Sequence, residues 1–229
     1  MQEEFDFIRK LRSGCRKIDL PELDDAALDL LFIYYRELKH WSRKINLIAK
    51  KATNPEILEK HFLDSLTLLP LLGETGSHLL DIGTGAGFPG LVCKVAKPDL
   101  QLTLVEPRQK RVAFLSHVTR TLKLEDVAIL TCRAGDEKML PSAGGYTHIT
   151  SRAVSDIKVF LDMSSRFLRP GIQVICMKGP KWEAELAAWE QSQDPNQLHF
   201  ISRKEYRLPQ FEGARHLLVF EQKISIYSD

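Results

Sequence analysis

A glycine-rich segment has the composition of a binding loop for a nucleotide-type cofactor. Residues 78–90 read HLLDIGTGAGFPG, in which an apolar, strand-like run is followed by Gly83, Gly85, Gly87 and Gly90. Glycine adopts positive φ values without steric cost, and its missing side chain lets a ligand approach the backbone closely. Pro89 suits the first turn of a helix, because the N–H that proline lacks would have no partner there. The segment predicts a strand, a tight turn and a helix that together hold a cofactor.

Asp81 indicates which cofactor the loop accepts. Gly85, Gly87 and Gly90 match the G-x-G-x-x-G pattern of dinucleotide enzymes. Asp81, however, lies two residues before Gly83 at the end of the expected strand, where its carboxylate would repel a pyrophosphate. A cofactor with a cationic sulfonium and an ammonium group tolerates this acid. We therefore expect S-adenosylmethionine, with a nicotinamide dinucleotide as the alternative.

Glu106 is the expected contact to the ribose of the cofactor. Residues 102–106 read LTLVE, and their distance from Gly87 matches the path through a helix to the next parallel strand. The carboxylate can accept hydrogen bonds from both ribose hydroxyls, and a charge-assisted bond of this kind contributes roughly 1.5–3 kcal/mol. The alternative is that Glu106 only begins a turn before Pro107.

Apolar periodicity predicts the elements that must position these residues. Three helices are expected first, over 4–12, 24–41 and 55–72. Asp24 or Asp25 is a suitable N-cap for the second helix and Asn54 for the third. Strands and helices then alternate, which indicates a mainly parallel sheet with helices on both faces. The expected segments are 78–82, 89–97, 102–106, 108–123, 127–132, 147–151, 155–168, 172–177 and 181–191.

Two further strand-like segments, 199–208 and 216–223, predict an antiparallel hairpin at the sheet edge. Seven strands that close with such a pair are typical of methyltransferases rather than of dehydrogenases. The expected fold class is thus α/β: a Rossmann-like class I AdoMet-dependent methyltransferase with a seven-stranded, mostly parallel sheet, an antiparallel edge hairpin and an N-terminal helical cap. We expect the cap to cover residues 1–74 and the methyltransferase core residues 75–229.

Composition restricts the class of protein further. The chain has 229 residues, of which 44% are hydrophobic and 27% charged, with no run long enough to span a bilayer. The first four residues, MQEE, are acidic where a signal peptide would be basic, so we expect a cytoplasmic protein without membrane contacts. The oligomeric state stays open, with a monomer favoured. The net charge of +2 requires that any basic surface be local. Reduced thiols without a metal are expected for Cys15, Cys93, Cys132 and Cys176.

Several motifs together resemble one protein family, from about Leu30 to the last strand. The motifs are Asn46-Leu47, His61-Phe62-Leu63-Asp64-Ser65, residues 81–90, Ser151-Arg152-Ala153 and Lys178-Gly179. With these motifs the chain resembles the bacterial ribosomal RNA small-subunit methyltransferase G family, also called glucose-inhibited division protein B. The resemblance implies AdoMet-dependent methylation of guanine N7 in 16S rRNA, either free or in the 30S particle.

The resemblance also implies roles for individual residues. Positions that match Gly83, Phe88, Ala134, Gly135 and Arg152 contact the cofactor. Catalytic roles are implied for Asn46, Arg133 and Arg152, which match positions linked to activity. The family usually has an acidic residue where Gly135 stands, and the adjacent Asp136 is a possible substitute.

The chemistry of the target atom is consistent with the motif after the fourth expected strand. Guanine N7 has an in-plane lone pair and no proton, so its methylation needs no general base. Ser151-Arg152-Ala153 is not the Asn-Pro-Pro-aromatic motif that holds an exocyclic amino group, and no Pro-Cys pair is present for attack on pyrimidine C6. Cys176 is expected to be a core thiol.

A structural role is the alternative for Arg152 and Asn46 and the expected role for His61 and Asp64. Arg152 is expected to contact cofactor or base, and an ion pair with Asp156 or Asp81 is the other possibility. Asn46 contacts the target base or ends a turn. His61 and Asp64 are expected to form a hydrogen-bonded pair that fixes the cap helices against the cofactor loop.

Local clusters of cations predict where RNA binds. The proposed contacts are Arg43, Lys44, Lys50, Lys51, Lys178 and Arg215, with Arg108, Lys110, Arg111, Lys181 and His216 as further candidates. Trp41 is available for stacking on a base, whereas Trp182 and Trp189, seven residues apart, are expected to pack. Two alternatives stay open: methylation of a small molecule or a protein, and a non-catalytic AdoMet-binding RNA-binding module.

Overall fold

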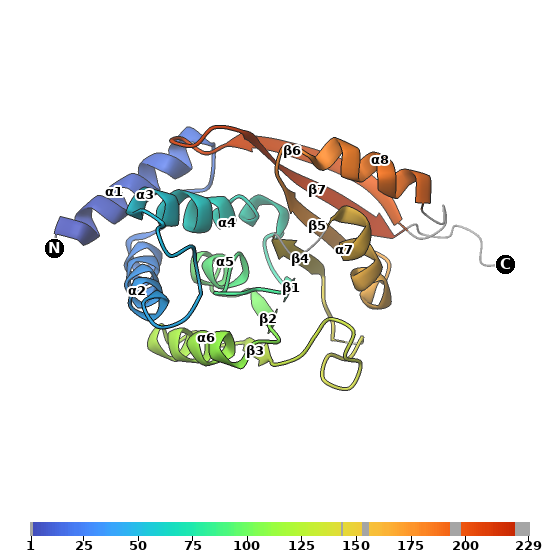
Figure 1. The fold of residues 1–229 in the computed structure, drawn as a ribbon, viewed down its shortest axis with the longest axis horizontal. Coiled ribbons are helices and arrows are strands. Elements are labelled where there is room, and N and C mark those ends of the chain that lie inside the picture. Colours follow the sequence, from blue (N-terminus) through green and yellow to red (C-terminus); the bar gives the residue numbers. More distant parts are fainter. Residues whose placement is uncertain (1, 143, 153–155, 193–197, 223–229) are drawn as a thin grey trace.

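A seven-stranded sheet runs through the computed structural model, which describes residues 2–142, 144–152, 156–192 and 198–222. The strand order is β3-β2-β1-β4-β5-β7-β6 (Figure 1). β1 to β5 pair in parallel, and β7 runs antiparallel to both β5 and β6. The strands are β1 (His78–Ile82), β2 (Gln101–Val105), β3 (Val127–Leu130), β4 (His148–Arg152), β5 (Gln173–Lys178), β6 (Leu198–Arg207) and β7 (Ala214–Gln222). The predicted fold class and the edge hairpin are confirmed.

The order of the strands creates a switch point beside β1. The chain runs from β1 outward through β2 to β3 and then returns to place β4 on the opposite side of β1. In this register Asp81 lies opposite Leu104 of β2 and Thr150 of β4. Ligands of open α/β sheets bind at such a point, outside the carboxyl ends of the strands. The glycine loop, Glu106 and Arg152 all follow or end strands at this edge.

Helices cover both faces of the sheet. In Figure 1, α2, α5 and α6 lie on one side of the sheet and α7 and α8 on the other. The helices that precede β1 are α1 (Gln2–Lys17), α2 (Asp25–Ser42), α3 (Asn54–Ile57), the π-helical η1 (Leu58–Leu63), α4 (Asp64–Leu66) and the 3₁₀ turn η2 (Leu69–Leu71). Those that follow are α5 (Gly90–Ala96), α6 (Gln109–Thr121), α7 (Ile157–Ser164), the 3₁₀ turn η3 (Ser165–Phe167) and α8 (Trp182–Ser192).

The third expected helix differs most from its prediction. Its N-cap is Thr53 rather than Asn54, because Thr53 Oγ1 accepts from the Glu56 amide while the Glu56 carboxylate accepts from the Thr53 amide. The helix then widens into the π turn η1 and ends at Leu66. The N-cap expected at Asp24 is confirmed, since its carboxylate accepts from the Ala27 amide at 2.7 Å. Residues 153–155 lie outside the described residues, and they include Ala153 of the Ser151-Arg152-Ala153 motif and the expected start of the sixth helix at residue 155.

The N-terminal helices share a hydrophobic core with the sheet. One buried cluster joins Leu31 and Tyr34 of α2 to Leu91 of α5, Leu102 of β2 and Phe114 of α6. The division into a cap (1–74) and a core (75–229) stays a prediction. None of the helices in the described residues is both long enough and apolar enough to cross a membrane.

Candidate functional site

The glycine loop has the backbone conformation that its sequence predicts. Gly83, Gly85 and Gly87 have φ angles of 71°, 63° and 96°. A Cβ on Gly87 would also lie 2.5 Å from the Tyr34 hydroxyl and 2.6 Å from a methyl carbon of Leu91, whereas a Cβ on Gly85 would meet nothing nearer than Arg111 at 3.6 Å. Gly87 is therefore required for packing as well as for backbone conformation, and space remains beside Gly85.

Asp81 lies beneath this loop and braces it. Its Oδ2 accepts hydrogen bonds from Thr84 Oγ1 at 2.7 Å and from the Gly90 amide at 2.9 Å, while Oδ1 has no partner among the described residues. The side chain has no exposed surface, and the cofactor-binding role expected for Asp81 stays a prediction. Burial raises the pKa of this carboxyl to about 7.

Glu106 supports the loop from the neighbouring strand. Its Oε1 accepts from the Arg108 amide at 2.9 Å, and its Oε2 accepts from the Gly85 amide at 3.1 Å and from Arg111 Nη1 at 3.4 Å. The turn interpretation is thus correct for Oε1. The contact between Glu106 and a ribose stays a prediction.

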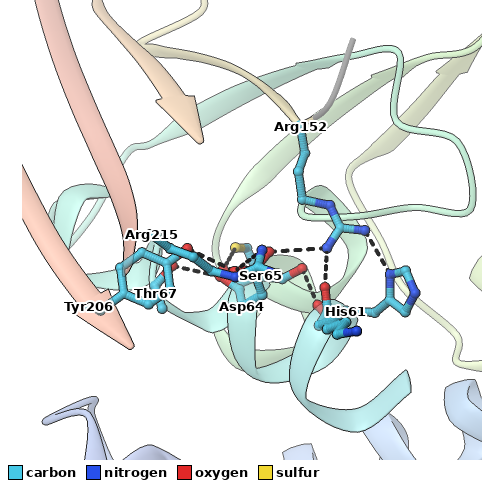
Figure 2. A network of polar contacts seen from close by, with 9 residues as sticks. His61, Asp64, Ser65, Thr67, Arg152, Tyr206 and Arg215 are labelled. Atoms are coloured by element: carbon cyan, nitrogen blue, oxygen red, sulfur yellow. Dashed lines mark hydrogen bonds and ion pairs between the residues drawn. The ribbon is translucent and has the colours of Figure 1, made fainter. Parts of the chain in front are cut away.

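Arg152 extends from the carboxyl end of β4 onto the helical segment η1–α4 (Figure 2). Its Nη1 donates to the Lys60 carbonyl at 2.6 Å and to Asp64 Oδ2 at 3.2 Å, and its Nη2 donates to His61 Nδ1 at 2.8 Å. The expected partners Asp156 and Asp81 are therefore wrong, and Asp64 takes their place. The pairing of His61 with Asp64 is also wrong in its direct form, because Arg152 lies between the two side chains and binds both.

The acceptor role of His61 depends on its protonation state. Burial, and next the positive charge of Arg152, lower the pKa of the imidazole to about 3. The ring is thus neutral near pH 7, with Nδ1 free to accept from Arg152. Its other side packs against Phe88 of the glycine loop at 5.0 Å between ring centroids, and Arg152 lies 5.2 Å from the centre of the Phe88 ring. Phe88 thus connects the glycine loop with Arg152 and His61.

Asp64 is the centre of a buried network (Figure 2). Besides Arg152 at Oδ2, its Oδ1 accepts from Tyr206 Oη of β6 at 2.8 Å and from Arg215 Nη1 of β7 at 3.1 Å. The carboxylate is 1% exposed, whereas the Arg152 side chain is 17% exposed. The network therefore fixes one face of the Arg152 guanidinium and leaves a small part of this group accessible.

The expected cofactor and catalytic residues after β3 lie in a loop. Arg133 and Gly135 are exposed and Ala134 is half-buried. The Ala134 carbonyl accepts from Arg166 Nη2 at 2.6 Å, which ties this loop to η3. A Cβ on Gly135 would meet nothing within 4 Å. The position can therefore hold the acidic side chain that the resemblance implies, although glycine stands there.

The residues 43–51, after α2, form a basic loop near the glycine loop. Arg43, Lys44, Asn46, Lys50 and Lys51 are all exposed. The Asn46 carbonyl accepts from Arg111 Nε at 3.4 Å, and the same guanidinium contacts Glu106, so the loop lies beside the expected cofactor site.

Other predicted RNA contacts are occupied within the protein. Lys178, 12% exposed, forms an ion pair with Glu185 at 2.7 Å, and Arg215 is bound to Asp64. The ring of Trp41 packs against Phe114 and His117 rather than standing free. Trp189 packs on Phe220, as expected, and Trp182 packs on His216.

Comparison with known sequences identifies the family. Residues 27–218 match the family model GidB, described as rRNA small subunit methyltransferase G. A ribosomal RNA small subunit methyltransferase G of Desulfotalea psychrophila is 51% identical over 215 residues, which cover 94% of this chain and 98% of that protein. Its counterpart in Myxococcus xanthus is 39% identical over 95% of this chain and 98% of that protein. The chain belongs to the rRNA small subunit methyltransferase G family.

Solved structures support the same fold for this methyltransferase G family member. M. jannaschii TYW2, solved in complex with AdoMet, has a TM-score of 0.55 at 14% identity and covers 79% of this chain and 80% of its own. The B. subtilis m1A22 tRNA methyltransferase TrmK has a TM-score of 0.54 at 13% identity, with 70% of this chain and 65% of its own covered. At this identity the likeness concerns the fold.

Sequence reasoning missed three supporting residues of this methyltransferase G family member. Tyr34 donates to the Ala86 carbonyl and stacks on Phe88 at 5.4 Å between ring centroids. Arg166 holds Ala134, and Tyr206 holds Asp64. A signal was available for the tyrosines, because a buried tyrosine normally needs a hydrogen-bond partner for its hydroxyl. That signal does not name the partner.

Proposed function

We propose that this protein transfers a methyl group from S-adenosylmethionine to N7 of a guanine in the 16S rRNA of the small ribosomal subunit. Membership of the methyltransferase G family supports the reaction class and the RNA substrate. The observation that carries the proposal is the juxtaposition, at the switch point beside β1, of a glycine loop braced by a buried acid and an arginine held in one orientation.

The residues at this edge fit the cofactor. Oδ1 of Asp81 is a buried acceptor without a partner in the described part of the chain, which suits an ammonium donor. Open space lies beside Gly85 and Gly135. When bound, S-adenosylmethionine supplies an electrophilic methyl group on a cationic sulfonium. A cation near Asp81 favours its ionised form and so offsets the effect of burial on its pKa.

The residues of the chain contribute by orientation rather than by proton transfer. Guanine N7 attacks with a lone pair and loses no proton, so the reaction requires no general base. The partly exposed guanidinium of Arg152 can hydrogen-bond to the base or stack on its plane. Neutral His61 and the Asp64 side chain hold that guanidinium on its buried side. Fixed geometry of this kind lowers the entropic part of the barrier.

The basic loop after α2 is the surface that we assign to RNA. Its four exposed cations are Arg43, Lys44, Lys50 and Lys51. Arg111 joins this loop to Glu106, so phosphates bound here would lie beside the cofactor. Removal of Lys50 and Lys51 together should lower RNA affinity and reduce the slope of log K against log[salt] by about 1 for each phosphate that the variant no longer binds. Binding with an unchanged slope would contradict the assignment.

The test of the function uses purified protein, tritiated S-adenosylmethionine and 16S rRNA transcribed without modification, free or assembled into 30S particles. Label at an alkali-labile guanine is the expected result, and comparison of the two substrates shows which form is used. Label confined to protein or small molecules would overturn the proposal. Arg152→Ala should lower the rate of transfer strongly while leaving a measurable residual rate: loss of AdoMet affinity assigns Arg152 to the cofactor, and intact affinity assigns it to the RNA.

A further inference from the structure

The β6–β7 hairpin contacts the helical segment that holds Arg152 at two buried acids. At one point Tyr206 Oη and Arg215 Nη1 bind Asp64. At the other, the amide and the side chain of Gln210 donate to the Glu59 carboxylate at 2.9 and 2.6 Å. Glu59 belongs to η1 and is itself buried. The hairpin therefore holds η1–α4 from the side opposite to Arg152 (Figure 2).

The Asp64 carboxylate needs all of its donors because it is buried. A carboxylate that leaves water is stable only when hydrogen bonds and opposite charges replace its hydration. Among the described residues its side-chain donors are Arg152, Arg215 and Tyr206, and the Tyr206 contact is the shortest of the three at 2.8 Å. Burial raises the pKa of the Tyr206 phenol, so its oxygen keeps the proton that it donates.

Tyr206 is better suited than Arg215 to fix the orientation of this carboxylate. Tyr206 is buried on a paired strand, with its backbone in register with Arg215 of β7. The side chain of Arg215 is 32% exposed and ends a longer chain of rotatable bonds. A rigid ring loses less conformational entropy when it holds a partner.

We propose that Tyr206 is a positioning residue for Arg152. Its hydroxyl holds Oδ1 of Asp64, so that Oδ2 faces Arg152 Nη1 and the guanidinium stays on η1–α4 beside Phe88 of the glycine loop. Tyr206 acts only through Asp64 and touches neither cofactor nor RNA. The consequence for turnover rests on the proposed methyl transfer, whereas the consequence for the mobility of Arg152 does not.

The kinetic test is a double-mutant cycle of Tyr206→Phe with Arg152→Ala, in which Tyr206→Phe removes a single oxygen. We expect Tyr206→Phe to lower kcat/KM by about tenfold, close to the value of one hydrogen bond to a charged group. Arg152→Ala lowers kcat/KM for the cofactor or for the RNA, and Tyr206→Phe should lower it for the same one of the two. In the Arg152→Ala background it should have no further effect. An equal loss in both backgrounds, or no loss in either, would overturn the proposal.

A matched control is Tyr35→Phe, which removes a hydroxyl that donates to Glu3 at 3.2 Å, outside the network. It should leave kcat/KM unchanged. If the loss of activity in both tyrosine variants followed the decrease in their melting temperatures, Tyr206 would contribute to general stability and would not position Arg152.

Nuclear magnetic resonance of ¹⁵N-arginine-labelled protein tests the proposal without any methyl transfer. Arg152, assigned through Arg152→Lys, should show slow rotation about Nε–Cζ in the wild type and faster rotation in Tyr206→Phe. In the wild type alone, the Tyr206 hydroxyl proton should exchange slowly with water. Rapid exchange of that proton would refute the positioning role even if Tyr206→Phe failed to fold. Absent methyl transfer with both signatures present would instead refute the proposed function.

Discussion

The two sides of the site are held in different ways. On the β1 and β2 side, carboxylates bind backbone amides that are close in the sequence: Asp81 and Gly90 are nine residues apart, and Gly85 and Glu106 are 21 apart. On the β4 side, side chains bind side chains from distant segments. Arg152 is 88 residues from Asp64, and Tyr206 is 142 residues from the same acid.

The glycine-loop side of the site therefore depends on local backbone conformation, whereas the Arg152 side depends on the assembled fold. Closing a long loop costs more conformational entropy than closing a short one, and the bonds that close it form only when the intervening elements are in place. The glycine loop should thus respond to changes in backbone conformation, and the Arg152 side to changes in charge balance. Substitutions in each half test the distinction.

The largest expected effect is in the distant network. Asp64→Ala leaves the guanidinium groups of Arg152 and Arg215 without their shared counterion, which should lower the free energy of unfolding by about 3–5 kcal/mol, as for other broken buried pairs. Urea denaturation measures the change. Asp25→Ala is the control, because Asp25 pairs with Arg12 at an exposed position and its loss should matter little. Similar losses of unfolding free energy in both variants would show that the buried network gives Asp64 no larger contribution to stability than an exposed ion pair.

The next effect is in the glycine loop. Gly87→Ala combines positive φ with overlap against Leu91 and the Tyr34 hydroxyl, so we expect a loss of about 3 kcal/mol. Gly85→Ala carries the backbone penalty alone, about 1–2 kcal/mol. Urea denaturation measures the free energy of unfolding of the two variants, and the difference between their losses is the contribution of packing at Gly87. Equal losses would show that Gly87 is needed only for its backbone conformation.

A smaller effect concerns the pH dependence of stability. The pKa of Asp81 is about 7 in the folded protein and 3.8 in its ordinary environment, so the folded state holds this proton more tightly. The resulting stabilisation is complete below pH 3.8 and is lost progressively as the pH rises through 7. Asp81→Asn should remove this loss, because an amide does not ionise in this range. The amide oxygen can still accept from Thr84 and Gly90, so the loop should keep its structure.

Urea unfolding at pH 5 and pH 8 measures the difference between the wild type and Asp81→Asn. His61 has a lowered pKa of about 3 and contributes with the opposite sign, since its stabilisation is lost as the pH falls below 6.5. That contribution is the same in both proteins and cancels in the comparison. Identical pH profiles would mean that Asp81 is ionised in the folded protein throughout this range.

Much of this architecture follows from local patterns. The parallel strands, the edge hairpin and the positive φ of the loop glycines agree with prediction because apolar periodicity and glycine act over a few residues. Arg152 shows where such reasoning ends: Asp81 and Asp156 were the candidate partners by sequence, and only the packing of η1–α4 against β4 brings Asp64 to the guanidinium instead. The Thr53 cap was missed because Asn54 is a good cap by type, whereas Glu56 completes a box with Thr53.

The smallest expected effect concerns the loop after β3. Gly135→Glu introduces the acid that the resemblance implies, at a position where a Cβ meets nothing within 4 Å. A new hydrogen bond to the cofactor should tighten AdoMet binding by about 2–10-fold. Isothermal titration calorimetry measures the affinity, and Ser142→Glu, at an exposed position farther along the same loop, serves as the control. Unchanged affinity in Gly135→Glu would indicate that Asp136 already fills the role.

The chain order of the hairpin has a consequence for biosynthesis. Tyr206 and Arg215 lie on β6 and β7, which a ribosome synthesises after every other described element. A nascent chain that has emerged only through β5 already contains the glycine loop and Arg152, but Asp64 still lacks two of its three side-chain donors. The Arg152 side of the site would thus be completed only after the last hairpin has been translated.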